Sequence, residues 1–158
     1  MTRIDFYVLP ELRLDAREHF AVRLAAKAFR QGHRSLIQVA DDAGVERLAA
    51  RLWDEPRNAF LGHARLGAPG IDHRAPVVLA AQRELAQMDP AALPVHDLLI
   101  NLELDVPARF AAFDRVAEII CQDEKVRDAG RVNYRFYRER GYPLHHHDLA
   151  RRQAREST

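Results

Sequence analysis

Short apolar runs and longer stretches with helical spacing alternate along the chain. The apolar runs predict β-strands at residues 4–9, 35–40, 77–81 and 97–104. Apolar positions three and four residues apart predict α-helices at residues 16–31, 41–53 and 126–140. One more helix is expected to begin at Asp105 and to carry Phe110, Phe113, Val116, Ala117 and Ile120.

The other stretches have no clear period. Residues 58–76 contain three glycines and two prolines and are expected to form a loop, with Phe60 and Leu61 as a buried anchor. The stretch 82–95 favours neither helix nor loop. The charged tail at residues 150–158 is expected to fray.

Strands that alternate with helices indicate right-handed βαβ units. The sequence therefore predicts a single α/β domain over residues 1–149, with three α/β/α layers and a mainly parallel sheet. This class of fold often binds nucleotides, but the first strand-to-helix turn, residues 9–15, contains no glycine. Phosphate-binding loops need glycines there because side chains would keep the phosphates from the backbone N–H groups, so a nucleotide-dependent enzyme is disfavoured.

Charge and cysteine content narrow the classes of function. Lysine and arginine total 24 against 23 acidic residues, and the resulting net charge of +1 argues against a dedicated nucleic-acid-binding protein. Cys121 is the only cysteine, which excludes a disulfide framework and a cysteine-based zinc site. Neither a signal peptide nor a membrane-spanning segment is recognisable, so a cytoplasmic protein is expected.

Candidate catalytic and metal-binding residues are few. His145, His146 and His147 precede Asp148, but consecutive side chains point in different directions, which favours adventitious metal affinity in a mobile tail. His96–Asp97 resembles a general-base pair, yet no nucleophile accompanies it. We therefore expect no metal, no cofactor and no catalytic activity of the chain's own.

The final predicted helix carries a row of cations. At about 100° per residue, one stripe of this helix contains Arg127, Arg131, Tyr134, Arg135 and Arg138. The opposite face, expected to dock on the core, contains Val126, Ala129, Val132, Phe136 and Tyr137. A solvated helix face with an Arg135–Glu139 ion pair is the alternative interpretation.

Ile120 before this helix and Tyr142 after it would complete an apolar pocket ringed by arginines. Such a pocket suits a short acidic peptide that ends in an aromatic residue with a free carboxylate, because guanidinium groups pair with carboxylates in a fixed geometry. Single-stranded nucleic acid would use the same residue types and is the second hypothesis. An enzyme that uses His96–Asp97 is the third.

Separated blocks of the chain resemble the chi subunit family of bacterial DNA polymerase III holoenzyme, over nearly the whole length. The blocks with the resemblance are residues 5–9, 23–33, 52–53, 60–61, 97–102, 113–118 and 134–142. Residues 83–95 and those after Leu149 do not share in it.

The resemblance implies a non-catalytic accessory subunit of the clamp-loader assembly, with an α/β/α fold that lacks a phosphate loop. It also implies two partners, the psi subunit and the acidic C-terminal tail of single-stranded DNA-binding protein, which ends in phenylalanine. The family's tail-binding residues correspond to Arg131, Tyr134, Arg135 and Ile120; Arg127, Arg138 and Tyr142 are added from helical geometry alone. The psi-binding surface is placed near Trp53 and Phe60 as a hypothesis.

Overall fold

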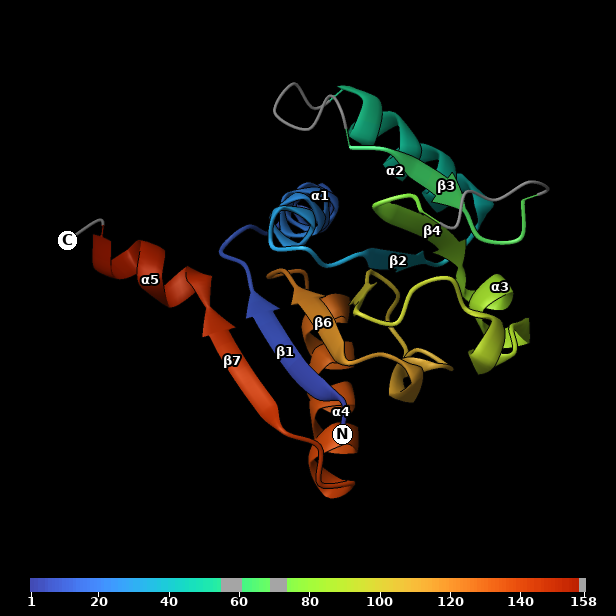
Figure 1. The fold of residues 1–158 in the computed structure, drawn as a ribbon. Helices are drawn as coiled ribbons and strands as arrows, with labels where there is room; N and C mark the ends of the chain where they lie inside the picture. The colour runs from blue at the N-terminus through green and yellow to red at the C-terminus, as the bar shows by residue number, and fades with distance from the viewer. Residues whose placement is uncertain (55–60, 69–73, 157–158) are drawn as a thin grey trace.

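A computed structural model describes residues 1–54, 61–68 and 74–156. These residues contain a single sheet of seven parallel strands in the order β3-β4-β2-β5-β6-β1-β7 (Figure 1). The strands are β1 (Arg3–Val8), β2 (Ser35–Val39), β3 (His63–Arg65), β4 (Val77–Ala81), β5 (Leu98–Asn101), β6 (Arg115–Ile120) and β7 (Leu144–Asp148). The predicted α/β/α architecture with a parallel sheet is confirmed.

Helices cover both faces of the sheet (Figure 1). On one face, α1 (Asp15–Arg30) and α2 (Asp42–Asp54) pack against a core cluster that includes Ile37 and Ile119. On the other face, α3 (Gln82–Gln87) and α4 (Glu124–Glu139) pack against a cluster that includes Ile4 and Phe6. The last helix, α5 (Leu149–Glu156), continues directly from the edge strand β7.

The prediction of a helix from Asp105 onward is wrong. That segment forms a short 3₁₀ turn, Phe110–Ala112, followed by the strand β6. The apolar residues Phe113, Val116 and Ile120 fall by chance at helical spacing, but β6 pairs with β1 on one side and β5 on the other. A strand in this position is buried on both faces, and its one acidic residue, Glu118, interrupts the apolar run that would have revealed it.

Three more segments differ from the sequence-based expectation. Within the predicted loop, residues 63–65 form the short edge strand β3, and the unassigned stretch 82–95 contains α3 and a 3₁₀ turn, Pro90–Ala92. The tail expected to fray forms α5 as far as Glu156. Leu61 packs against the core as expected, whereas Phe60 lies outside the described residues, and the proposed domain boundary at residue 149 stays a prediction.

A buried polar cluster ties α4 to the centre of the sheet. The carboxylate of Glu118 is 1% exposed and accepts hydrogen bonds from the side-chain amide of Asn101 at 2.9 Å and from the hydroxyl of Tyr137, on α4, at 3.0 Å. Burial raises the pKa of Glu118 to about 7, because the loss of water around the charge outweighs the hydrogen bonds that favour the ionised form.

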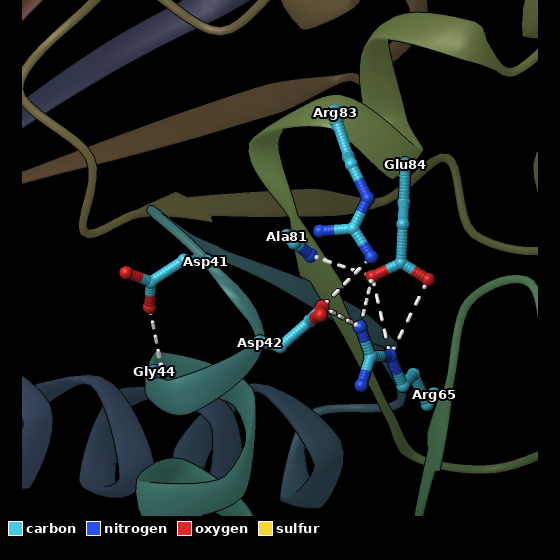
Figure 2. Close-up of polar contacts among 7 residues, drawn as sticks. All are labelled: Asp41, Asp42, Gly44, Arg65, Ala81, Arg83 and Glu84. Atoms are coloured by element: carbon cyan, nitrogen blue, oxygen red, sulfur yellow. Dashed lines mark hydrogen bonds and ion pairs between the residues drawn. The ribbon is translucent and has the colours of Figure 1, made fainter.

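Ion pairs join the carboxyl ends of β2, β3 and β4 (Figure 2). The guanidinium group of Arg65 at the end of β3 pairs with Glu84 at 3.0 Å and with Asp42, and Arg83 pairs with Asp42 at 2.8 Å. Glu84 also accepts a hydrogen bond from the backbone N–H of Ala81 at 3.0 Å, at the start of α3. In doubly wound sheets ligands bind where neighbouring strands send their connections to opposite faces. Here β2 leads to α2 and β4 to α3, so these ion pairs occupy one such position.

The raised pKa of Glu118 predicts a stability that depends on pH. The unfolded-state pKa is near 4.5 and the folded-state pKa is about 7, so the folded state holds the proton more tightly. The contribution of this group is therefore fully present below about pH 4.5 and is lost as the pH rises to about 7, by roughly 3 kcal/mol. Glu118→Gln removes the titration, so the variant should gain stability relative to the wild type as the pH rises. Urea unfolding of both proteins at pH 5 and pH 7.5 measures this, and an unchanged difference between them would show that Glu118 is ionised in both states.

Candidate functional site

The helix α4 is fixed by its cap and by polar contacts on its buried face. The side chain of Asp123 caps it by accepting hydrogen bonds from the backbone N–H groups of Lys125 and Val126, at 3.1 and 3.3 Å. On the docked face, the amide of Asn133 donates to the carbonyl oxygen of Leu104 at 2.8 Å, and Tyr137 reaches Glu118. These contacts set the rotation of the helix about its axis.

The predicted docked face is right only in part. Val126 and Tyr137 are buried, and Ala129 and Phe136 are half-buried, but Val132 is 62% exposed and is wrongly placed. The buried positions in its stead are Gly130 and Asn133. Neither residue has a large apolar side chain. Hydrophobic spacing therefore predicts a buried face that is rotated about the helix axis from the observed one.

Gly130 lets α4 approach the sheet closely. A Cβ atom at this position would lie 2.8 Å from Cδ1 of Ile120 and 3.3 Å from its Cγ1, whereas ordinary contacts between carbon atoms are longer. Ile120, at the carboxyl end of β6, thereby fills the space under the first half of α4 and remains 9% exposed.

A cleft of about 760 Å³ runs between α4, the outer strands β1 and β7, and the start of α5. Six residues predicted for the site line it together: Ile120, Arg127, Arg131, Tyr134, Arg135 and Arg138. The lining also contains residues that the sequence analysis missed, namely Phe6, Val8, Gln122, Gly130, His146, Asp148, Ala150 and Arg151. Most of these lie on strands or on α5, whose place beside α4 is set by sheet topology and left no local signal.

Tyr142, also predicted for this site, lies elsewhere. Gly141, with φ +78°, ends α4 in a left-handed turn, and the backbone N–H of Tyr142 then donates to the carbonyl oxygen of Tyr137 at 3.2 Å. The Tyr142 ring packs edge to face on Phe110, with centroids 5.2 Å apart. Extrapolating the helical stripe past residue 140 misses this change of direction.

The floor of the cleft is aromatic. Phe6 contacts the ring of Tyr134 edge-on, with centroids 5.3 Å apart, and stacks on His146 at 5.9 Å. Tyr134 and His146 also meet at 5.3 Å. Tyr134 is therefore half-buried and held by two rings, with its position fixed before any ligand arrives.

The cationic wall is largely unpaired. Arg131 pairs with Asp128 at 3.2 Å, and both side chains are exposed. Within the described residues the guanidinium groups of Arg127, Arg135 and Arg138 have no ion pair, and the alternative Arg135–Glu139 pair is not found. Among the described residues Asp148 is the carboxylate that lines the cleft, and its Oδ1 accepts a hydrogen bond from the backbone N–H of Arg151 at 2.8 Å. The cleft therefore combines an excess of positive charge with an apolar floor.

Topology explains why a cleft forms here. The strand β6 continues into α4 on one face of the sheet, and its neighbour β1 continues into α1 on the opposite face (Figure 1). The two connections diverge, which leaves an opening beyond the carboxyl ends of the strands. Val8 and Ile120 are the last residues of those strands, and both line the cleft.

The three consecutive histidines belong to the sheet. His145, His146 and His147 lie in β7 rather than in a mobile tail, so that expectation is wrong. His147 contacts Asp5 at 2.9 Å and stacks on Tyr7 at 4.5 Å. Burial alone would raise the pKa of Asp5, but hydrogen bonds from His147 and Arg115 outweigh it and hold that pKa below its usual value. No cluster in the described ranges has the three or more side chains that a metal ion would need.

His96 and Asp97 hold loops in place. His96 Nδ1 lies 3.1 Å from the carbonyl oxygen of Ala112, and Asp97 accepts a hydrogen bond from the backbone N–H of Arg34 at 2.8 Å. Neither residue lines the cleft. These contacts give both side chains a structural role.

The fold and the cleft define a class of α/β protein that presents a cationic, apolar-floored groove beside the last long helix. A family model described as DNA polymerase III chi subunit, HolC, matches residues 1–145. The chain is 41% identical over 151 residues to DNA polymerase III subunit chi of Pseudomonas aeruginosa, covering 96% of this chain and 99% of that protein. It is 29% identical over 131 residues to the subunit of the same name from Escherichia coli, covering 83% and 84%. The chain belongs to the chi subunit family of DNA polymerase III.

A third relative has the same name. DNA polymerase III subunit chi of Haemophilus influenzae is 27% identical over 140 residues, covering 89% of this chain and 92% of that protein. The expected family resemblance is thus confirmed. None of the helices in the described ranges has both the length and the apolar character needed to cross a bilayer.

The contact between Gly130 and Ile120 predicts an energetic coupling. Gly130→Ala adds a Cβ atom against Ile120, so the variant should be destabilised by about 1 kcal/mol although alanine favours helix more than glycine does. In an Ile120→Val background, which lacks Cδ1, the same change should be neutral or stabilising. Urea unfolding of the four proteins gives the coupling free energy, and equal effects of Gly130→Ala in both backgrounds would contradict the close approach.

Proposed function

We propose that the α4 cleft binds the acidic C-terminal tail of single-stranded DNA-binding protein. The observation that carries this proposal is the row of arginines on α4, three of them without an ion pair in the described residues, beside an aromatic floor in one cleft. Membership of the chi family supports it, because the family model matches residues 1–145, which include this helix. The protein acts in this proposal as a non-catalytic subunit in the cytoplasm that links the polymerase to coated single-stranded DNA.

The chemistry of the cleft suits such a tail. Arg131 and Arg135 are placed to pair with carboxylates, and Ile120 and Phe6 offer an apolar surface for a terminal phenylalanine ring. A volume of about 760 Å³ accommodates only a few residues. We therefore expect weak, salt-sensitive binding, roughly micromolar, which many tails on one DNA strand would strengthen by avidity.

We also propose that the psi subunit binds near Trp53, at the end of α2, and links the protein to the clamp loader. Trp53 is 74% exposed, and its ring meets His63 of β3 edge-on with centroids 6.3 Å apart. An indole this exposed is a typical binding residue. Because β3 and β7 are the opposite edges of the sheet, this surface and the α4 cleft can be occupied at the same time.

Direct binding of single-stranded nucleic acid is the competing function for the cleft. Base stacking needs a free aromatic face. Tyr134 already contacts Phe6 and His146, and the floor is shared among these three rings. This arrangement favours the peptide over the nucleic acid.

Titration with a tail peptide tests the main proposal. A short acidic peptide ending in Asp-Ile-Pro-Phe should bind the wild type with a roughly micromolar Kd, and Arg135→Ala should weaken binding about tenfold or more, because a carboxylate loses its cation. The matched control is Arg140→Ala, an exposed arginine near the end of α4 that does not line the cleft. Fluorescence anisotropy at low and high salt measures all three proteins.

Two outcomes would reject the tail-binding role. One is the absence of binding by the wild type, and the other is equal binding by the peptide with an amidated C-terminus. Oligonucleotide binding that grows with length and is lost in Arg135→Ala would instead support the nucleic-acid hypothesis.

The psi surface is tested by Trp53→Ala. Loss of this exposed ring should weaken co-purification with psi by about tenfold or more while binding of the tail peptide is unchanged. Phe29→Ala removes another exposed aromatic ring, on α1, and serves as the control. Retention of psi by the Trp53 variant would place the psi surface elsewhere.

A further inference from the structure

A second cationic groove lies on the opposite face of the sheet from the α4 cleft. It consists of two adjoining hollows of about 350 and 240 Å³ between α1, β1 and α5, which share Tyr7, Leu24, Lys27 and Arg115. Apolar side chains form its floor: Tyr7, Phe20, Leu24 and Leu149. No aspartate or glutamate lines either hollow in the part of the chain that the structure describes.

Three cations at this groove are free to meet a ligand. Within the described residues Arg23, Lys27 and Arg152 have no ion pair, and each is exposed. Arg115 is different, because its guanidinium group already donates to Asp5 at 2.6 Å and to the Tyr7 hydroxyl at 2.7 Å. Asp5 is itself fully buried beneath the groove and is also bonded to Arg3 and His147, so it does not offset the free cations at the surface.

We propose that this groove is a second docking site for an acidic segment of a partner protein, with carboxylates on Arg23, Lys27 and Arg152 and an apolar side chain on the Phe20–Leu24 floor. The inference goes beyond the tail-binding role of the α4 cleft and does not rest on it. A groove without carboxylates, rimmed by unpaired cations, attracts a negatively charged chain, and the apolar floor adds surface that a simple anion would not use.

The dimensions and the rings favour a peptide over nucleic acid. From Phe20 to Gln31 the groove follows α1 for about 16 Å, the length of roughly five extended residues. The ring of Tyr7 is 8% exposed and is already stacked on His147 at 4.5 Å. Arg23 lies over the ring of Phe20 at 5.9 Å. The rings of Tyr7 and Phe20 are therefore already engaged by neighbouring side chains, which disfavours base stacking.

The helix α5 separates the two cationic grooves. Its consecutive residues Ala150 and Arg151 line the α4 cleft, whereas Leu149 and Arg152 line the second groove. Among the α5 side chains that the structure describes, one arginine thus lines each groove. The helix α5 lies at the sheet edge and follows directly from β7 (Figure 1).

A capped acidic peptide with one leucine, acetyl-Asp-Glu-Leu-Asp-Glu-Asp-amide, tests the proposal because it lacks a free terminal carboxylate. Methyl resonances in NMR spectra report the two sites separately: Leu24 and Leu149 for the second groove, and Ile120 for the α4 cleft. We expect saturable shifts of Leu24 and Leu149 on titration. Arg23→Ala combined with Lys27→Ala should weaken binding at that site about tenfold.

The control is the combination of Arg30→Ala and Lys125→Ala. It removes two exposed cations that line neither groove and gives the same net charge. The proposal is overturned if only Ile120 shifts, or if both double variants weaken binding equally. It is also overturned if an oligothymidylate of about twelve nucleotides shifts Leu24 and Leu149 while the peptide does not. Failure of the tail peptide to shift Ile120 would count against the α4 cleft alone.

Discussion

The seating of α4 on β6 is the constraint on which the surface of this protein depends. One carboxyl group, Glu118, receives hydrogen bonds from β5 through Asn101 and from α4 through Tyr137. A few residues away, the missing side chain of Gly130 lets the helix come down on Ile120. Together these contacts fix both the height and the rotation of α4. The row of arginines therefore lines the cleft beside β7 and α5, with its guanidinium groups exposed to solvent.

Two positions in the sheet have the topology at which α/β proteins bind ligands, and they differ in how their charged side chains are paired. At the ends of β2 and β4, Asp42, Arg65 and Glu84 satisfy one another's charges (Figure 2). At the ends of β6 and β1, Arg127, Arg135 and Arg138 have no ion pair within the described residues, and the opening remains. Opposite charges in one place and like charges in the other decide which of the two similar positions offers a binding surface.

The sequence predicts the fold class and the arginine stripe well, because both depend on local periodicity. The β2 and β4 strands are apolar runs, and the stripe of Arg127, Arg131 and Arg138 follows from helix geometry alone. Prediction fails where tertiary contacts override the local pattern. The buried Glu118 interrupts the apolar run of β6, so the local pattern predicts a helix in that segment. On α4, Gly130 and Asn133 occupy the buried face, and Val132 is therefore exposed.

The wall of the cleft formed by β7 and α5 could not be predicted from the local sequence pattern. His146 and Arg151 reach it only because β7 pairs with β1, and nothing in a run of three histidines signals a strand. His147 finds its partner in Asp5, at the other end of the chain. Long-range pairing of this kind leaves no periodic trace in either segment.

The position of β1 between β6 and β7 also has a consequence for the order of folding during synthesis. Asp5 meets Arg115 across 110 residues of chain and His147 across 142. The strand β1 leaves the ribosome before β6 and β7, so neither of its edges can pair until those strands are made, and such distant closures form late. Unfinished chains lack the cleft, so only a completed molecule can present the arginine-lined surface to a partner.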